Sequence, residues 1–286
     1  MLQEYYTLFN GNKIPKLGLG TWFIEDQEAD KAVKDAMKVG YRLIDTAQAY
    51  GNEVGVGKGI RESNIAREEI FVTSKIAAEE KSYDSAAKSI DETLEKMGLD
   101  YLDLMIIHSP QPWKEFRGAN RYFKENIEVW RALEDAYDEG KVRAIGVSNF
   151  LEDDLQNILD NSRIKPMVNQ ILVHISNTPS SLIEFCQHND ILVEAYSPIA
   201  HGEALKNPAI QKIAEKYHVS VPQLCIRYDL QLGTVVLPKT ANLAHMKMNA
   251  EIDFVISEED MEKLKHIEQI QDYGDSSFFP VFGGEI

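Results

Sequence analysis

The chain has 286 residues and a mass of 32.4 kDa, and 44% of its residues are hydrophobic and 27% charged. These proportions are typical of a globular protein with a sizeable core and exclude a disordered or fibrous chain. The formal net charge is −16, because 30 Lys and Arg residues stand against 46 Asp and Glu residues. Nucleic acids and anionic membranes attract basic surfaces, so we expect neither as a partner.

Two cysteines, Cys186 and Cys225, are too few for a disulfide framework or a cysteine-based zinc site in a chain of this length. Residues 1–4 lack the basic region and apolar run of a signal peptide. No apolar stretch approaches the ~18–20 residues that span a bilayer. We therefore expect a cytoplasmic protein.

The chain begins with a predicted β-hairpin. Residues 5–9 and the segment from Ile14 onward resemble strands, and Asn10-Gly11 lies between them. This dipeptide favours a two-residue type I′ turn, in which both residues have positive φ.

After the hairpin, short apolar runs rich in β-branched residues alternate with amphipathic segments. We predict eight strands, at residues 16–20, 43–46, 70–76, 102–108, 142–148, 167–171, 191–196 and 234–238. Helical spacing of apolar residues predicts helices at about 28–39, 53–63, 82–97, 125–139, 152–161, 180–189, 208–218 and 242–250. Two further helices fit at 221–231 and 258–271.

Continuous apolar strands that alternate with helices indicate a parallel sheet covered on both faces. Eight such units predict an α/β protein of the (β/α)8 TIM-barrel type, with an N-terminal β-hairpin and two extra helices. A doubly wound sheet is the alternative, but no G-x-G-x-x-G motif follows the first strand. No linker or low-complexity tract divides the chain, so we expect residues 1–286 to form one domain.

Two segments fall outside the alternation of strands and helices. Residues 110–124 form a long loop that contains Trp113, and residues 272–286 form an aromatic, glycine-rich tail. Long loops on a rigid scaffold often carry function.

Ionisable residues end three neighbouring predicted strands, where barrel enzymes place their catalytic groups. These residues are Asp45, Lys75 and His108, and Tyr50 follows in the loop after Asp45. A lysine in an otherwise buried strand needs a carboxylate partner, and Asp45 on the adjacent strand is the natural one. We expect the ammonium group to lower the pKa of Tyr50 from about 10, so that this tyrosine exchanges protons near neutral pH.

Three of these four residues also have a simpler explanation. Asp45 could cap a helix, Tyr50 could pack in the interior and His108 could be a core histidine. Four such groups at neighbouring strand ends nevertheless favour an active site.

Two motifs resemble signatures of the aldo-keto reductase family. Residues 40–47 and 50–53 read GYRLIDTA and YGNE, which is similar to the first signature. Residues 140–150 read GKVRAIGVSNF and match the second almost letter for letter. The resemblance covers essentially the whole chain and is to bacterial-type members similar to 2,5-diketo-gluconate reductases. It implies an oxidoreductase that reduces aldehydes and ketones with NAD(P)H.

The resemblance implies a catalytic tetrad of Asp45, Tyr50, Lys75 and His108. In this tetrad Tyr50 is the general acid, Lys75 and Asp45 tune it, and His108 orients the substrate carbonyl.

The resemblance also implies that Ser148, Asn149 and Gln170 hold the nicotinamide carboxamide and that Tyr196 stacks on the nicotinamide ring. Considered without the family, Ser148-Asn149 could lie in the N-cap region of the next helix. The full cofactor-binding set comprises Gly20, Thr21, Ser148, Asn149, Gln170, Tyr196, Ser197, Ile199, Lys239, Thr240, His245 and Asn249.

The region that would bind the cofactor phosphate departs from the family pattern. Lys239 is placed to pair with a phosphate and Asn249 with the adenine, but His245 stands where the family usually has arginine, and Met248 where an acidic residue is frequent. Arginine offers a permanent charge and a bidentate fork for phosphate, whereas histidine is mostly neutral at pH 7. We therefore predict NADPH as the cofactor, with appreciable NADH activity.

The substrate pocket is less well defined by the sequence. Trp22 matches an aromatic pocket wall of the family, while Ala77 and Ser109 stand where relatives often have tryptophan. Trp113 could fill the space that these small residues leave, or it could simply pack its own loop. Small aldehydes, α-dicarbonyls and keto-sugar derivatives are all compatible substrates, and we expect a monomer.

Two other classes of function fit the sequence less well. A non-catalytic nicotinamide-binding barrel has no need of a buried lysine–aspartate pair. A metal-dependent hydrolase could use Asp45 and His108, but no His-x-His motif or carboxylate cluster accompanies them. We predict no metal site.

Overall fold

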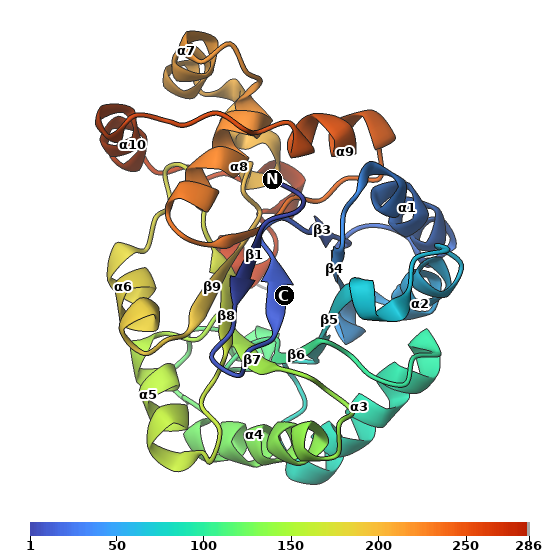
Figure 1. The fold of residues 1–286 in the computed structure, drawn as a ribbon. Coiled ribbons are helices and arrows are strands. Elements are labelled where there is room, and N and C mark those ends of the chain that lie inside the picture. Colours follow the sequence, from blue (N-terminus) through green and yellow to red (C-terminus); the bar gives the residue numbers. More distant parts are fainter. Residues whose placement is uncertain (285–286) are drawn as a thin grey trace.

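The computed structural model describes residues 1–284, in which eight parallel strands form a barrel (Figure 1). The strands pair in chain order, and bridges from Leu17 to Val236 and from Gly20 to Lys239 join the first strand region to the last. The strands are β3 (Leu19–Gly20), β4 (Leu43–Asp45), β5 (Phe71–Ile76), β6 (Leu104–Ile107), β7 (Ile145–Ser148), β8 (Val168–Leu172), β9 (Leu192–Tyr196) and β10 (Val235–Leu237).

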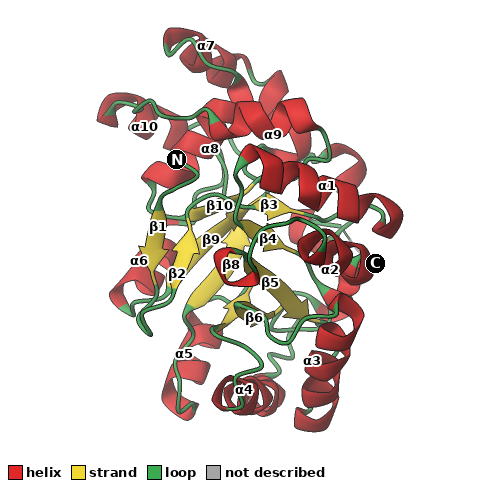
Figure 2. Cartoon of the chain, turned by 45° about the vertical axis from the view of Figure 1, so that its right-hand side comes forward, coloured by secondary structure: helices red, strands yellow, loops and turns green. Residues whose placement is uncertain are grey.

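Figures 1 and 2 show helices packed around the outside of the barrel. The described residues form ten α-helices. They are α1 (Asp26–Val39), α2 (Glu53–Arg61), α3 (Tyr83–Met97), α4 (Phe123–Asp138), α5 (Glu152–Asn161), α6 (Ser180–His188), α7 (Pro208–Lys216), α8 (Val221–Gln231), α9 (Leu243–Ala250) and α10 (Glu258–Lys265). The predicted TIM-barrel fold is confirmed, and every predicted strand and helix is present, with small shifts at the ends of all but the last helix.

The last helix is shorter than predicted. Its apolar spacing continues to residue 271, but α10 ends at Lys265. From there the chain leaves the helix, and Ile270 packs against a cluster formed by Tyr273, Phe282 and Ala200 instead. The packing of Ile270 against this cluster therefore favours an early end of the helix, although the apolar spacing of residues 266–271 would allow the helix to continue.

The N-terminal hairpin pairs β1 (Tyr5–Thr7) with β2 (Lys13–Pro15), but the predicted two-residue type I′ turn is wrong. The turn is wider, because Thr7 faces Lys13, and within it only Gly11 has a positive φ, of 89°. Asn10 and Asn12 donate side-chain hydrogen bonds to the carbonyl oxygen of Arg143, of 2.9 and 2.7 Å. These hydrogen bonds hold the hairpin against the segment just before β7 (Ile145–Ser148), and this tertiary contact outweighs the local preference for a two-residue turn.

The strands are buried on both faces, which explains their continuous apolar sequences. All six residues of β5 are buried, including Lys75 at 0% exposure. The outer helices cover the barrel closely. In α2, Gly55 faces the carbonyl oxygen of Asp26 in α1, and a Cβ at this position would collide with it.

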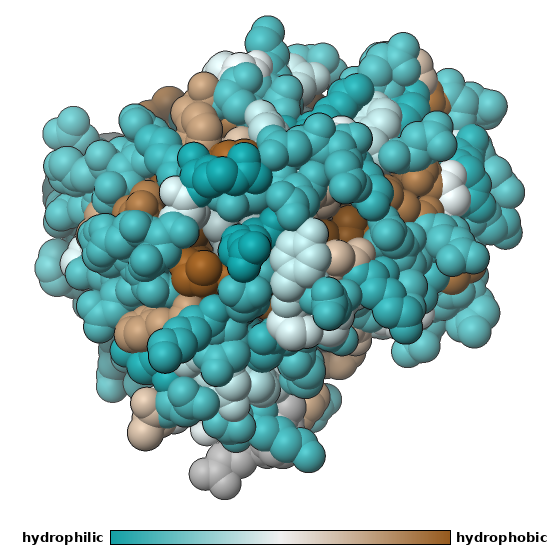
Figure 3. Space-filling model, turned by 90° about the horizontal axis from the view of Figure 1, so that it is seen from below, coloured by the Kyte–Doolittle hydropathy of each residue, from teal (hydrophilic) through white to brown (hydrophobic). Residues whose placement is uncertain are grey.

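The side of the molecule shown in Figure 3 is mostly hydrophilic, and apolar residues show there only in small separate areas. Within residues 1–284, no helix is both long and apolar enough to cross a membrane.

Candidate active site

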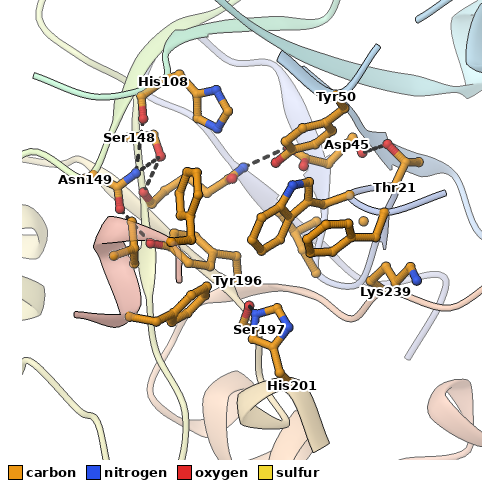
Figure 4. Close-up of a pocket in the computed structure, with 18 of the residues that line it drawn as sticks. Thr21, Asp45, Tyr50, His108, Ser148, Asn149, Tyr196, Ser197, His201 and Lys239 are labelled. Atoms are coloured by element: carbon orange, nitrogen blue, oxygen red, sulfur yellow. Dashed lines mark hydrogen bonds between the residues drawn. The ribbon is translucent and has the colours of Figure 1, made fainter. Parts of the chain in front are cut away.

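A cavity of about 530 Å³ opens at the carboxyl ends of the barrel strands (Figure 4). Asp45 ends β4, Ser148 ends β7 and Tyr196 ends β9, and all three line this cavity. The parallel strands thus bring residues far apart in the sequence to a single site, as expected for a barrel of this kind.

Lys75 lies beneath the cavity at the centre of a buried polar cluster. Its Nζ donates hydrogen bonds to Asp45 Oδ1 at 2.6 Å, to the Thr46 carbonyl oxygen at 2.8 Å and to the Tyr50 hydroxyl at 3.3 Å. An ammonium group has three protons, so each of these contacts can use one. The cluster thus orients a fixed positive charge toward Tyr50.

The pKa of Tyr50 moves in the opposite direction from our expectation. Burial raises its pKa, and the Lys75 charge offsets this effect only in part. Although burial alone would lower the pKa of Lys75, the Asp45 carboxylate and Tyr50 outweigh it, so the pKa of Lys75 is raised. Tyr50 therefore keeps its proton at neutral pH, beside a lysine that keeps its charge.

His108 faces Tyr50 across the cavity, with 5.6 Å between the ring centroids. Burial and the nearby Lys75 charge hold the pKa of His108 well below its usual value. The imidazole is therefore neutral at pH 7, and a neutral imidazole can donate one hydrogen bond.

The side chains proposed to hold the nicotinamide carboxamide are connected by hydrogen bonds. Ser148 Oγ donates to the Gln170 carbonyl oxygen at 2.8 Å, and Asn149 Nδ2 donates to the His108 carbonyl oxygen at 3.0 Å. The Tyr196 hydroxyl donates to Asn149 Oδ1 at 2.6 Å. These bonds link the ends of β6, β7, β8 and β9 in one wall of the cavity.

The alternative reading of Ser148-Asn149 as a helix cap is wrong. Helix α5 starts at Glu152, its N-cap residue is Leu151, and Asp154 Oδ2 accepts the Leu151 backbone N–H at 3.0 Å. Asn149 instead adopts a left-handed conformation, with φ of 61°.

The remaining cofactor-binding candidates fall into two groups. The first group lines the cavity and contains Gly20, Thr21, Ser197, Ile199 and Lys239. The second group lies outside it, toward or in α9, and contains Thr240, His245 and Asn249. His245 is exposed in the first turn of α9, whereas Asn249 is buried near its end.

Both tryptophans predicted for the substrate pocket line the cavity. Trp113 is 7% exposed, and its ring lies 5.2 Å from the His108 ring and 4.7 Å from the Phe279 ring. Of the two interpretations of Trp113, the structure favours the one in which it forms part of the pocket.

Sequence reasoning missed several wall residues, among them Phe23, His201, Phe279 and Phe282. The aromatic composition of the tail is the signal that could have identified Phe279 and Phe282. His201 carried no such signal, but its two ring nitrogens lie 3.1 Å from Ser197 Oγ and 2.9 Å from Ser276 Oγ. It thus joins the loop after β9 to the tail.

Across residues 1–284, no three His, Cys, Asp or Glu side chains are grouped so that they could hold a metal ion. A metal-dependent hydrolase therefore gains no support from the arrangement of these side chains.

Comparison with known proteins agrees with this site. The model of the aldo/keto reductase family matches residues 16–269. Glyoxal reductase of Bacillus subtilis is 44% identical over 265 residues, which is 92% of each chain.

Solved structures of similar proteins show the same fold. An aldo/keto reductase from Brucella melitensis is 41% identical, with a TM-score of 0.84 over 92% of this chain and 98% of its own. An aldo-keto reductase from Bombyx mori, solved in complex with NADP, is 33% identical, with a TM-score of 0.87 over 97% and 96% of the two chains.

The chain belongs to the aldo/keto reductase family, a family of oxidoreductases that use nicotinamide cofactors.

Proposed function

We propose that the protein is an NADPH-dependent reductase that converts aldehydes and ketones into alcohols, with Tyr50 as the general acid. The observation that carries this proposal is the contact of 3.3 Å between Nζ of the buried Lys75 and the hydroxyl of Tyr50, a partly buried residue that lines the cavity. A purely binding protein has no need of an acid supported by a buried ion pair.

The proton transfer follows from the charges around Tyr50. The protonated hydroxyl donates its proton to the carbonyl oxygen as negative charge develops there, and Lys75 stabilises the tyrosinate that is left. Asp45 keeps Lys75 charged, since their separation is 2.6 Å. His108 donates a second hydrogen bond to the same oxygen and orients the carbonyl.

A nicotinamide cofactor fits the donor and acceptor groups that surround the cavity. Ser148, Asn149 and Gln170 would hold its carboxamide, Tyr196 would stack on its ring, and Lys239 would pair with a phosphate. Lys239 forms no ion pair within the described part of the chain, and burial lowers its pKa, with only a smaller opposing effect from Glu28. The lack of an acidic partner in a chain with a net charge of −16 supports a bound anion as the partner of Lys239. When bound, the reduced nicotinamide supplies the hydride that reduces the carbonyl carbon.

We propose NADPH as the preferred cofactor, with NADH also used. His245 is exposed where a permanent positive charge would favour the extra phosphate of NADPH. The ratio of kcat/KM for the two cofactors tests this proposal. We expect a ratio below ~10³, which corresponds to about 4 kcal/mol, and a larger ratio would contradict dual use.

The proposed substrates are small aldehydes and α-dicarbonyls, with keto-sugar derivatives also compatible. The name of the Bacillus subtilis relative, glyoxal reductase, supports the α-dicarbonyls. Absorbance at 340 nm, followed with a panel of carbonyl compounds and both cofactors, provides the test. If no member of the panel oxidises a cofactor that the protein binds, the chain is a non-catalytic binding barrel instead.

A further inference from the structure

Glu194 is a buried acid that none of the proposed steps uses. It lies in β9, is 0% exposed and sits directly beside Gln170 of β8 in the strand register. Its Oε2 accepts a hydrogen bond of 2.9 Å from Gln170 Nε2. A carboxyl group this deeply buried needs an explanation, because burial strongly disfavours its charged form.

The Gln170 amide is held between two carboxyl groups. Its Nε2 donates to Asp45 Oδ2 at 2.8 Å and to Glu194 Oε2 at 2.9 Å. An amide nitrogen has two protons, so both are engaged, and an amide oxygen turned toward the same two acceptors would be repelled by them. The orientation of the amide is therefore fixed, and its oxygen is left as the acceptor that Gln170 offers to the cavity it lines.

Glu194 can accept the hydrogen bond from Gln170 while its own carboxyl group is protonated and neutral. The charged groups that face it are Asp45 from β4 and Lys75 from β5, and burial together with Asp45 raises the pKa of Glu194 to about 8. The neutral acid still accepts a hydrogen bond through its carbonyl oxygen. The Asp45–Lys75 pair then remains balanced, with one negative and one positive charge.

We propose that Glu194 is a positioning residue for the nicotinamide. It holds the Gln170 amide so that Gln170 Oε1 accepts from the carboxamide N–H₂ of the cofactor. This inference rests on the proposed cofactor site and adds a residue that does not itself touch the cofactor.

Two substitutions distinguish the effect of the hydrogen-bond acceptor at position 194 from the effect of a charge there. Glu194→Leu removes the acceptor at similar volume, whereas Glu194→Gln keeps an oxygen acceptor and is neutral. We expect Glu194→Leu to raise the Kd and the KM for NADPH about tenfold, the effect of one lost hydrogen bond, with kcat at saturating cofactor changed less than about threefold. We expect Glu194→Gln to bind NADPH within about twofold of the wild type.

Thr73→Val is the matched control. Thr73 is also buried in the barrel at 0% exposure, and its hydroxyl has no hydrogen-bond partner in the described residues. We expect its NADPH affinity to equal that of the wild type.

A double substitution distinguishes positioning from a general structural effect. If Glu194 acts through Gln170, adding Glu194→Leu to Gln170→Ala leaves the Kd for NADPH unchanged from that of Gln170→Ala alone. If Glu194→Leu does not fold by circular dichroism, Glu194→Met replaces it in both experiments.

Three results would overturn the inference: unchanged NADPH binding in the Leu or Met variant, equal weakening in Glu194→Gln, or additive effects in the double variant. Failure of the proposed function looks different, because the wild type itself would then oxidise NADPH with no carbonyl compound of the panel, whether or not it binds the cofactor.

Discussion

The nicotinamide end and the phosphate end of the proposed cofactor site are built in contrasting ways. At the nicotinamide end, Asp45, Lys75 and Gln170 are at most 4% exposed and bonded to one another. At the phosphate end, Lys239 and His245 are exposed. The first region is rigidly organised for one chemistry, whereas the second relies on few charges. Catalysis should therefore be easy to abolish, and cofactor preference easy to change.

The largest effect is expected from Tyr50→Phe, which removes the acid from the organised end. We expect kcat to fall by about 10²–10⁴, because proton transfer to the carbonyl oxygen is lost. The Kd for NADPH, measured by fluorescence titration, should stay within about twofold. A variant that retains most of the wild-type kcat would show that Tyr50 is not the acid.

Lys75→Met tests how strongly the buried cluster depends on its one cation. The substitution leaves Asp45 buried without its ion-pair partner, and breaking a buried pair costs about 3–5 kcal/mol of the free energy of unfolding. Urea denaturation measures this loss. Lys88→Met is the control, because Lys88 pairs with Glu92 on the surface and is 79% exposed. Equal losses in the two variants would refute the contrast between buried and surface charges.

At alkaline pH, the Glu194→Gln variant should have a larger free energy of unfolding than the wild type. The pKa of Glu194 is raised from 4.5 to about 8, so between these values the folded state binds a proton that the unfolded state releases. Wild-type stability therefore falls as pH rises through this window, by on the order of a few kcal/mol, and the Gln variant escapes this loss. Urea denaturation of both proteins at pH 5 and pH 8.5 provides the comparison. A difference between them that does not change with pH would contradict the assignment.

The smallest effect is expected at the phosphate end. His245→Arg adds a permanent charge and should raise the NADPH-to-NADH ratio of kcat/KM about tenfold, because the guanidinium pairs with phosphate. The matched control is His266→Arg, at an exposed position just after α10. An unchanged ratio in His245→Arg would show that position 245 does not contact the phosphate.

The same contrast appears in what the sequence could predict. The hydrophobic pattern was sufficient to locate the strands and helices, although not the end of the last helix, because buried parallel strands have continuous apolar sequences and the covering helices have helical spacing of apolar residues. The strand ends then placed Asp45, Lys75 and His108 together. These inferences need only the order of the strands and the direction in which they run.

Other features depended on contacts that only the folded chain provides. The direction of the Tyr50 pKa shift depends on burial competing with the Lys75 charge, and the sequence suggests only the charge. The hairpin turn is widened by bonds to the carbonyl oxygen of Arg143, more than 130 residues away. Glu194 lies in an apolar strand without any motif to mark it. Long-range packing decided each of these features.

Transfer of deuterium tests the central claim most directly. NADPH deuterated at both positions on C4 of the nicotinamide, incubated with the protein and glyoxal, should give an alcohol product with one deuterium on the reduced carbon. Mass spectrometry of the product detects it. If the protein binds this NADPH but no deuterium reaches the product with any carbonyl compound of the panel, the chain is a binding barrel and the proposed reaction is contradicted.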